Sequence, residues 1–162
     1  MASTLELLRR LAAEQVDFVL VGGMAAVAHG STTVTEDADV CIRFDLATLE
    51  RVLRAVGPLS PRERMNPNRP ALGSDAGRFV GYRNLDLTTD EGVLDLLGDV
   101  IGVGDFSSVS AASIDMNLGD FTCRVLGLDA LIRCKTALGR PKDRQVVSEL
   151  ELVQRHLAKR SP

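Results

Sequence analysis

The spacing of apolar residues along the chain predicts both helices and strands. Leu5, Leu8 and Leu11 recur at helical spacing, and a second amphipathic segment follows Asp45, a residue type suited to cap a helix. By contrast, "DFVLVGG" is a short apolar run that ends in two glycines, which indicates a buried strand and a sharp turn. The helices predicted from such patterns span residues 3–15, 24–29, 45–57, 128–139 and 143–160.

Period-two alternation of polar and apolar residues marks a second strand, "DADVCIRF" at residues 37–44. Further strands are predicted at 78–89 and 92–100, and a hairpin at 112–126 turns over "NLGD". Helices and strands are thus mixed along the chain without strict alternation. This order predicts an α+β fold, in which a twisted mixed β-sheet is backed by helices.

Two segments interrupt these patterns. Residues 58–77 hold four of the six prolines together with three arginines, so we expect a long functional loop there, and a second loop at 102–111. The chain contains no internal repeat and no internal linker. We therefore expect a single domain over residues 1–162, with the C-terminal helices at 128–160 packed on it.

The composition is that of an ordinary globular protein, with 45% hydrophobic and 25% charged residues. No apolar stretch approaches 18 residues, and no basic region precedes the first apolar residues, so we expect neither a membrane partner nor a signal peptide. Cys41, Cys123 and Cys134 are odd in number and form no CxxC pair, which favours free thiols in a reducing cytoplasm. Only two histidines occur, which argues against a zinc site.

The net charge of −3 hides an uneven distribution. Residues 84–132 carry nine acidic residues against one arginine, whereas residues 133–160 carry eight basic residues against three acidic ones. An acidic centre suits cations, and a basic C-terminal region suits phosphates. A solvated charged helix explains the basic region equally well.

Asp37 and Asp39 are the sharpest candidates for chemistry. On a strand, residues two apart project from the same face, roughly 7 Å from each other along the backbone, so their carboxylates can converge. Two carboxylates repel unless a cation holds them, and hard oxygen ligands favour Mg²⁺ or Mn²⁺. The alternative is that these aspartates only serve a turn at the start of the strand.

Gly22 and Gly23 follow a predicted strand and open a predicted helix. Backbone N–H groups at such a turn can bind a phosphate, although a glycine turn needed only for packing is the alternative. Neither a Walker A loop nor a GxGxxG motif is present in this stretch. Asp95 is a lone charge in an apolar strand, which needs a partner or a metal, with Asp86 on the neighbouring strand as competitor.

Four stretches taken in order, "VGGMAAVAHG", "TEDAD", "VLDLL" and "LGLDALIRCKTALGRPKD", resemble the DNA polymerase β-type nucleotidyltransferase superfamily. In their detailed sequence these stretches are similar to small bacterial AbiEii-like nucleotidyltransferases, and the similarity extends over most of residues 16–153. The resemblance implies a minimal nucleotidyltransferase fold. It also implies Mg²⁺-dependent transfer of a nucleoside monophosphate from an NTP to a hydroxyl acceptor, with release of pyrophosphate.

The resemblance also implies roles for individual residues. Two metal ions would be bridged by Asp37 and Asp39, and Asp95 would complete one metal shell and help to deprotonate the acceptor. The residues that would bind the nucleotide are Gly22, Gly23, Thr35, Lys135 and Arg140. Alternatives remain for Lys135, as a surface lysine, and for Thr35, as a residue that suits a strand. A structural role is expected for His29.

AbiEii-like relatives act as toxins of toxin–antitoxin pairs, with tRNA among their acceptors, which implies an RNA or protein acceptor and an antitoxin partner. Thr33 stands where many relatives carry an arginine. This favours an alternative, a non-catalytic module of the same fold that binds nucleotide, RNA or a partner protein. A small-molecule adenylyltransferase is a third reading, and the few aromatic residues offer little surface for base stacking.

Overall fold

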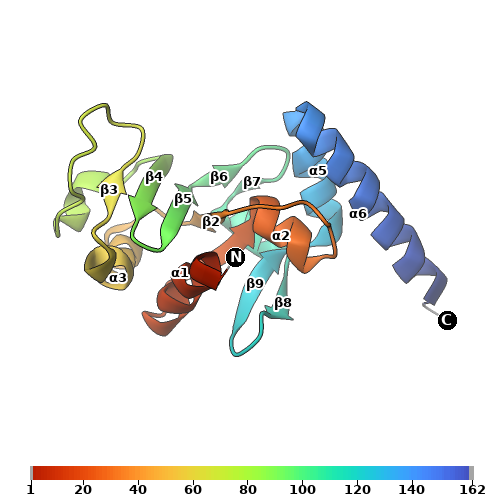
Figure 1. Cartoon of the computed structure of the whole chain (residues 1–162), viewed down its shortest axis with the longest axis horizontal. Helices are drawn as coiled ribbons and strands as arrows, with labels where there is room; N and C mark the ends of the chain where they lie inside the picture. Colours follow the sequence, from red (N-terminus) through yellow and green to blue (C-terminus); the bar gives the residue numbers. More distant parts are fainter. Residues whose placement is uncertain (1, 161–162) are drawn as a thin grey trace.

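The computed structural model describes residues 2–160, which form a seven-stranded mixed sheet with six α-helices around it (Figure 1). The strand order is β3-β4-β5-β2-β1-β9-β8, and β6 and β7 form a separate two-stranded sheet. The strands are β1 (Phe18–Val21), β2 (Asp37–Ile42), β3 (Arg62–Glu63), β4 (Asn84–Thr89), β5 (Gly92–Leu97), β6 (Asp99–Val100), β7 (Gly104–Asp105), β8 (Ser113–Asn117) and β9 (Thr122–Leu126). The predicted α+β class is confirmed.

The helices fall where the apolar spacing predicts them, with one addition. They are α1 (Ala2–Ala13), α2 (Gly22–Ala28), α3 (Leu46–Val56), α4 (Phe106–Ala111), α5 (Leu128–Leu138) and α6 (Pro141–Arg160), together with the short 3₁₀ helices η1 (Gly57–Leu59) and η2 (Ala76–Phe79). The predicted cap of α3 is present, because the Asp45 carboxylate accepts a hydrogen bond from the Thr48 amide at 2.8 Å.

Parallel pairing occurs twice in the large sheet, between β1 and β9 and between β2 and β5, and the other neighbours are antiparallel. β1 lies between two strands and all four of its residues are buried, as expected for a short continuous apolar run. α3 and β3 lie at one end of the molecule, and α5 and α6 lie at the other (Figure 1).

Three predictions made for irregular segments are wrong. Residues 58–77 are not one loop, because β3 adds an edge strand to β4 within them. Residues 78–83 are not a strand, because the chain passes through η2 and a turn before β4 begins. Residues 102–111 hold β7 and α4, and α4 begins after Asp105, whose carboxylate accepts a hydrogen bond from the Ser108 amide at 3.0 Å. Aspartate three residues ahead of a serine is an N-cap signal that the loop prediction overlooked.

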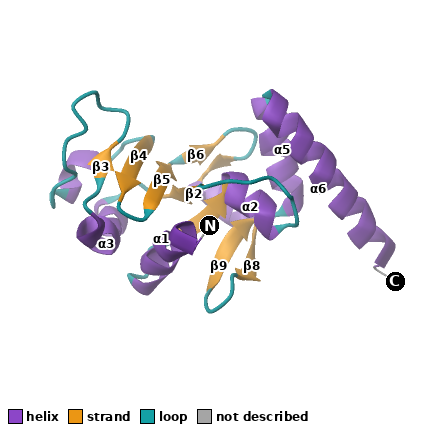
Figure 2. Ribbon diagram, viewed as in Figure 1, coloured by secondary structure: helices purple, strands orange, loops and turns teal. Residues whose placement is uncertain are grey.

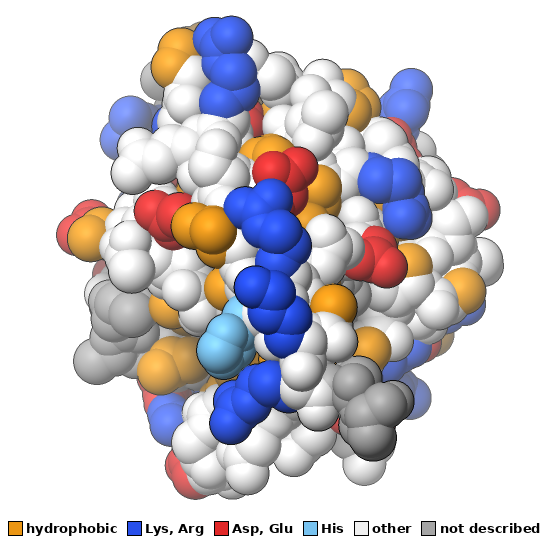
Figure 3. Space-filling model, turned by 90° about the vertical axis from the view of Figure 1, so that its right-hand side faces the viewer, with side chains coloured by type: hydrophobic (Ala, Val, Ile, Leu, Met, Phe, Trp, Pro, Cys, Tyr) orange, Lys and Arg blue, Asp and Glu red, His pale blue; other side chains and the backbone are white. Residues whose placement is uncertain are grey.

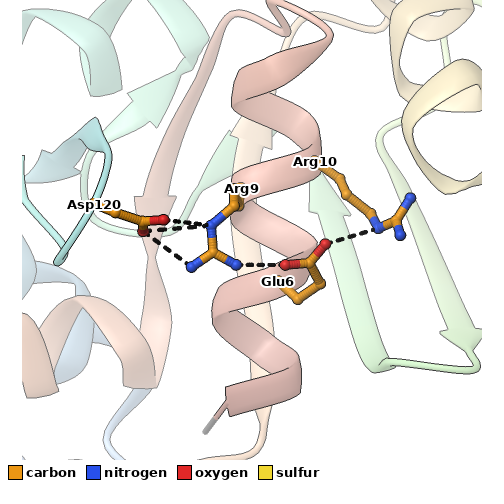
Figure 4. A network of polar contacts seen from close by, with 4 residues as sticks. All are labelled: Glu6, Arg9, Arg10 and Asp120. Carbon is orange, nitrogen blue, oxygen red and sulfur yellow. Dashed lines mark hydrogen bonds and ion pairs between the residues drawn. The ribbon is translucent and has the colours of Figure 1, made fainter.

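A polar network ties α1 to the turn between β8 and β9 (Figure 4). Arg9 donates to Asp120 on that turn, with Nη2 3.0 Å from Oδ1. Glu6 lies between Arg9 and Arg10 on the same helix and pairs with both. The hydrogen bond from Arg9 holds the pKa of Asp120 below its usual range, so this link persists at neutral pH.

The C-terminal part of α6 runs away from the sheet, and all of residues 154–160 are exposed (Figure 1). When the molecule is viewed from the end that carries α5 and α6, Lys and Arg side chains form a line down its face (Figure 3). Exposed basic residues of α6 include Arg144, Arg155 and Lys159. Within residues 2–160, none of the helices combines the length and the apolar character needed to cross a bilayer.

Candidate active site

Strand pairing explains how glycines and aspartates that are separated in sequence come together. β1 and β2 are antiparallel, and Val21, the last residue of β1, is the register partner of Asp39 near the start of β2. The chain turns into α2 directly after Val21, so Gly22 and Gly23 lie beside the Asp39 carboxylate. The two ends of the "VGG…DAD" stretch therefore belong to one place.

Three carboxylates lie side by side on one face of the sheet, which we call the acidic wall. Asp39 is the register partner of Asp95 on β5, and Asp95 is the register partner of Asp86 on β4. The opposite face carries apolar partners such as Ala38 and Leu94, which are fully buried. Neighbouring strands lie about 4.8 Å apart, so like charges in these positions repel one another strongly.

Asp39 shows this repulsion most clearly. Burial and then the charge of Asp95 raise its pKa to about 6, although an amide hydrogen bond from Gly23 and the charge of Lys135 act in the opposite direction. Burial also raises the pKa of Asp95, against the effect of its partner Arg64. A raised pKa means that the folded protein holds these charges at a cost in free energy.

Gly22 and Gly23 make room for two side chains of the site. A Cβ atom on Gly22 would lie 2.0 Å from Oδ2 of Asp39, and Gly22 has a φ of +66°, which favours glycine. A Cβ atom on Gly23 would lie 2.7 Å from Oγ1 of Thr35. The glycines thus position an aspartate and the adjoining loop, and phosphate binding by their amides stays a prediction.

A pair of buried charges stands opposite the acidic wall. Lys135 on α5 is only 7% exposed, so the reading as a surface lysine is wrong. Its Nζ atom lies 3.5 Å from Oδ1 of Asp143 on α6, which is 1% exposed. Burial alone would raise the pKa of Asp143, but a hydrogen bond from Arg140 at 2.5 Å and the charge of Lys135 outweigh it and lower that pKa. Gly139, with a φ of +63°, ends α5 and brings the two helices to this corner.

The acidic wall and these cations enclose a cavity of about 240 Å³. Asp37, Asp39 and Asp95 line it from the sheet, whereas Asp86 does not, which favours Asp95 as the third carboxylate. The helices contribute a basic wall, and the loop before β2 contributes hydroxyl groups. The remaining lining residues are Gly23, Ala26, Thr33, Val34, Thr35, Lys135, Arg140, Lys142, Asp143 and Val146.

A larger hollow of about 820 Å³ lies elsewhere, between α3 and the segment after it. Its lining mixes apolar residues such as Leu53 and Leu72 with the charged residues Glu50, Arg54 and Arg62. It does not share the carboxylates of the acidic wall, so it offers no comparable chemistry.

The loop at residues 29–36 returns over α2 to the start of β2 (Figure 2). Glu149 on α6 anchors it, because its carboxylate accepts hydrogen bonds from Ser31 Oγ at 2.7 Å and from the Thr32 amide at 3.0 Å. The anchored loop places Thr33 and Thr35 on the cavity lining. Thr33, the position at which an arginine would be expected, therefore faces the site.

His29 at the end of α2 has the structural role that the sequence suggested. Its Nε2 atom lies 2.8 Å from the carbonyl oxygen of Leu126, which links α2 to the end of β9. Three residues of the site were missed at the level of sequence, namely Arg64, Lys142 and Glu149. Of these, Lys142 stands inside the quoted "GRPKD" stretch and Glu149 carried no signal.

Arg64 holds the carboxylate of Asp95. It follows β3, and its Nη2 atom lies 2.6 Å and 2.7 Å from the two oxygens of Asp95. Its backbone amide donates to the carbonyl oxygen of Asp86 at 2.8 Å, which fixes the arginine next to the acidic wall. The predicted third carboxylate is therefore paired with a cation that the chain itself supplies.

The carboxylates that line the cavity offer the ligand atoms that a hard divalent cation prefers. Asp37, Asp39 and Asp95 present only oxygen atoms, and the described residues that line the cavity include no His or Cys. As the side chains stand, residues 2–160 contain no group of three or more His, Cys, Asp or Glu side chains that could hold a metal ion. The residue types fit Mg²⁺ or Mn²⁺, and the contact between Asp95 and Arg64 would have to change.

The sequence matches no protein-family model and no curated protein. Among solved structures, the fold is similar to that of a putative nucleotidyltransferase from Thermotoga maritima, with a TM-score of 0.55. The two chains are 17% identical, and the match covers 95% of this chain and 89% of that chain. The likeness concerns the course of the backbone, and this chain accordingly has a nucleotidyltransferase-like fold.

Proposed function

We propose that this protein is a Mg²⁺- or Mn²⁺-dependent nucleotidyltransferase that moves a nucleoside monophosphate from an NTP to a hydroxyl group and releases pyrophosphate. The observation that carries the proposal is the two-sided cavity. Asp37, Asp39 and Asp95 line one side, and Lys135 and Arg140 line the other. A triphosphate needs cationic partners along its length and a cation held by carboxylates at the reacting phosphorus, and these walls supply both kinds of group.

The roles of the residues follow from their places in the cavity. Arg140 and Lys135 would neutralise the phosphate charges, and Asp37, Asp39 and Asp95 would hold the divalent cation. When bound, that cation stabilises charge on the attacking and leaving oxygens. Asp95 would accept the proton of the acceptor hydroxyl as it attacks the α-phosphorus, and pyrophosphate leaves on the opposite side.

The test is transfer of label from α-labelled NTPs to total RNA, protein and small metabolites in parallel. Asp39→Asn should lower the transfer on the order of 10²- to 10³-fold, by analogy with the loss of one preorganised electrostatic group. Asp86→Asn is the matched control, because this carboxylate shares the sheet face but not the cavity lining. Equal transfer by wild type and Asp39→Asn would refute the proposal.

An RNA acceptor is supported by the basic residues of α6. Lys142 lines the cavity at the start of this helix, and the exposed residues Arg144 and Arg155, about three turns apart, share one face of it. Basic residues in a line attract a phosphate backbone without reading its sequence. The family resemblance extends the proposal to the toxin of a toxin–antitoxin pair with tRNA as acceptor and an antitoxin as protein partner. A protein acceptor is the other outcome that the labelling test distinguishes.

A second candidate is a catalytically inactive module that binds a nucleotide, an RNA or a partner protein. Thr33 on the cavity lining favours it, because many of the nucleotidyltransferases that the sequence resembles carry an arginine at this position. The engagement of Asp95 with Arg64 favours it as well. Calorimetry with a non-hydrolysable NTP separates the two, since this candidate predicts Mg²⁺-dependent binding without any transfer of label.

A further inference from the structure

Arg64 touches the acidic wall in an unusual way for an arginine. Both contacts to Asp95 come from the single atom Nη2, at 2.6 Å and 2.7 Å from the two carboxylate oxygens. Its Nε atom is buried and has no hydrogen-bond partner among the described residues. The usual strong arrangement uses two nitrogens in parallel as a fork.

Other pairs in the same chain do form that fork. Arg140 uses Nε and Nη2 on Asp143, at 2.5 Å and 3.2 Å, and Arg9 uses Nε and Nη2 on Asp120. The contact of Arg64 thus leaves unused the Nε donor that Arg140 and Arg9 use in their forked pairs. A buried donor without a partner lowers stability, so the contact between Arg64 and Asp95 is weaker than a forked pair and easier to replace.

The position of Arg64 also fits a replaceable cation. β3 is the edge strand of the sheet, and the backbone amide of Arg64 is tied to β4 through Asp86. The side chain reaches past β4 to β5, where Asp95 faces the cavity. The guanidinium can therefore move while the backbone stays paired.

We propose that Arg64 is an internal counter-ion that competes with the divalent cation for Asp95, so that metal binding requires this arginine to release the carboxylate. The inference rests on the metal site of the proposed function, and it makes Arg64 a positioning residue. The folded protein then keeps the carboxylates partly neutralised without metal. Its affinity for a divalent cation is lowered by the strength of the contact between Arg64 and Asp95.

The test is binding of Mn²⁺ alone, without nucleotide. Binding is measured as the loss of the free Mn²⁺ signal in electron paramagnetic resonance. Arg64→Gln should bind Mn²⁺ roughly 10- to 100-fold more tightly than wild type, the range that follows from the net strength of a hydrogen-bonded charge pair. Arg62→Gln is the matched control. It removes the same charge two residues earlier in the chain, but its guanidinium donates to the carbonyl oxygen of Arg69, so the Mn²⁺ affinity of this variant should stay within about threefold of wild type.

A double-mutant cycle shows whether the effect passes through Asp95. In the Asp95→Asn background, Arg64→Gln should leave Mn²⁺ affinity unchanged. The proposal is overturned by an unchanged or weaker affinity of Arg64→Gln, by an equal gain in Arg62→Gln, by a gain that persists without Asp95, or by absence of Mn²⁺ binding in every variant. General damage to the structure would weaken binding, so it cannot mimic the expected gain.

Two further arms keep the outcomes separate. Arg64→Lys retains the charge with fewer donors and should fall between wild type and Arg64→Gln, and it replaces Arg64→Gln if circular dichroism shows that the latter does not fold. Label transfer by wild type is measured alongside. Tighter Mn²⁺ binding by Arg64→Gln, together with no label transfer by wild type, would refute the proposed function and uphold Arg64 as a counter-ion. Normal transfer by wild type, together with an unchanged Mn²⁺ affinity of Arg64→Gln, would uphold the proposed function and refute the counter-ion.

Discussion

Replacement of the Asp39 carboxylate by the isosteric amide should make the metal-free protein more stable at neutral pH, although the same variant is expected to lose the proposed label transfer on the order of 10²- to 10³-fold. The reason is the cost of a buried charge beside other carboxylates. Burial and the charge of Asp95 raise the pKa of Asp39 to about 6, from the 3.8 of an ordinary aspartate. The amide side chain of the Asp39→Asn variant carries no charge, so it avoids that cost.

The size of the effect follows from this pKa difference. About two pKa units at 1.36 kcal/mol each give an upper limit of about 3 kcal/mol. The hydrogen bond that the Gly23 amide donates to the carboxylate already contributes to this pKa, so the limit includes its effect. We therefore expect Asp39→Asn to raise the free energy of unfolding by about 1–3 kcal/mol at pH 7.5.

The pH dependence of the free energy of unfolding follows from the difference between these two pKa values. Between about pH 4 and pH 6 the unfolded chain loses the proton of Asp39 while the folded protein keeps it. Stability from this group is therefore fully present below pH 3.8 and is lost as the pH rises through about 6. The advantage of Asp39→Asn should be below about 1 kcal/mol at pH 4.5 and constant above pH 7.

The assay is urea unfolding of wild type and Asp39→Asn at pH 4.5 and pH 7.5, with a chelator present. Unfolding is monitored by circular dichroism. Added Mn²⁺ should stabilise the wild type and not the variant, which reduces or reverses the difference between them. A variant that is less stable than wild type at pH 7.5, or a difference independent of pH, would refute the view that the Asp39 charge is held at a cost.

Two further predictions concern the frame of the site. Gly22→Ala should destabilise the protein by about 2–4 kcal/mol in urea unfolding, since its Cβ would lie 2.0 Å from Asp39, whereas Gly73→Ala, at a φ of +72° with open space around it, should cost only about 1 kcal/mol. An equal loss in both would mean that backbone strain alone is measured. Asp143→Ala leaves Lys135 buried without its carboxylate and should cost about 3–5 kcal/mol, and Lys135→Met combined with Asp143→Leu should recover most of it. A double variant as unstable as the single one would contradict this account.

Local patterns predicted most helices and strands because their causes are local. Apolar spacing placed α1, α3, α5 and α6, and the period-two pattern placed β2. The meeting of Gly22 with Asp39 depends on the antiparallel register of β1 and β2. The two strand patterns do not specify it, because two strands joined through a helix can also pair in parallel. The α4 helix was missed because six residues carry too little periodicity to be recognised.

The partner of Asp95 could not be predicted in the same way. A lone charge in an apolar strand signalled that a partner was needed, but nothing local distinguishes Arg64 from the other arginines of residues 58–77. The choice is made by β3, a two-residue strand that pairs with β4 in a region read as loop. Such a pairing depends on contacts across the sheet, so the sequence pattern of the segment itself does not reveal it.

Several features that lower the stability of this protein lie close together, around Asp39 and Asp95. Asp39 and Asp95 are in register on neighbouring strands and line the cavity. Gly22, at positive φ, lies against Asp39, and Arg64, with its unsatisfied donor, lies against Asp95. The opposite face of the same strands is apolar and fully buried, so apolar partners at the acidic positions would have given a more stable sheet. A cation between the carboxylates would relieve their repulsion and would free the arginine. At the proposed metal site, the stability given up in the metal-free protein would reappear as free energy of cation binding, which is why Asp39→Asn is expected to be more stable and to transfer less label.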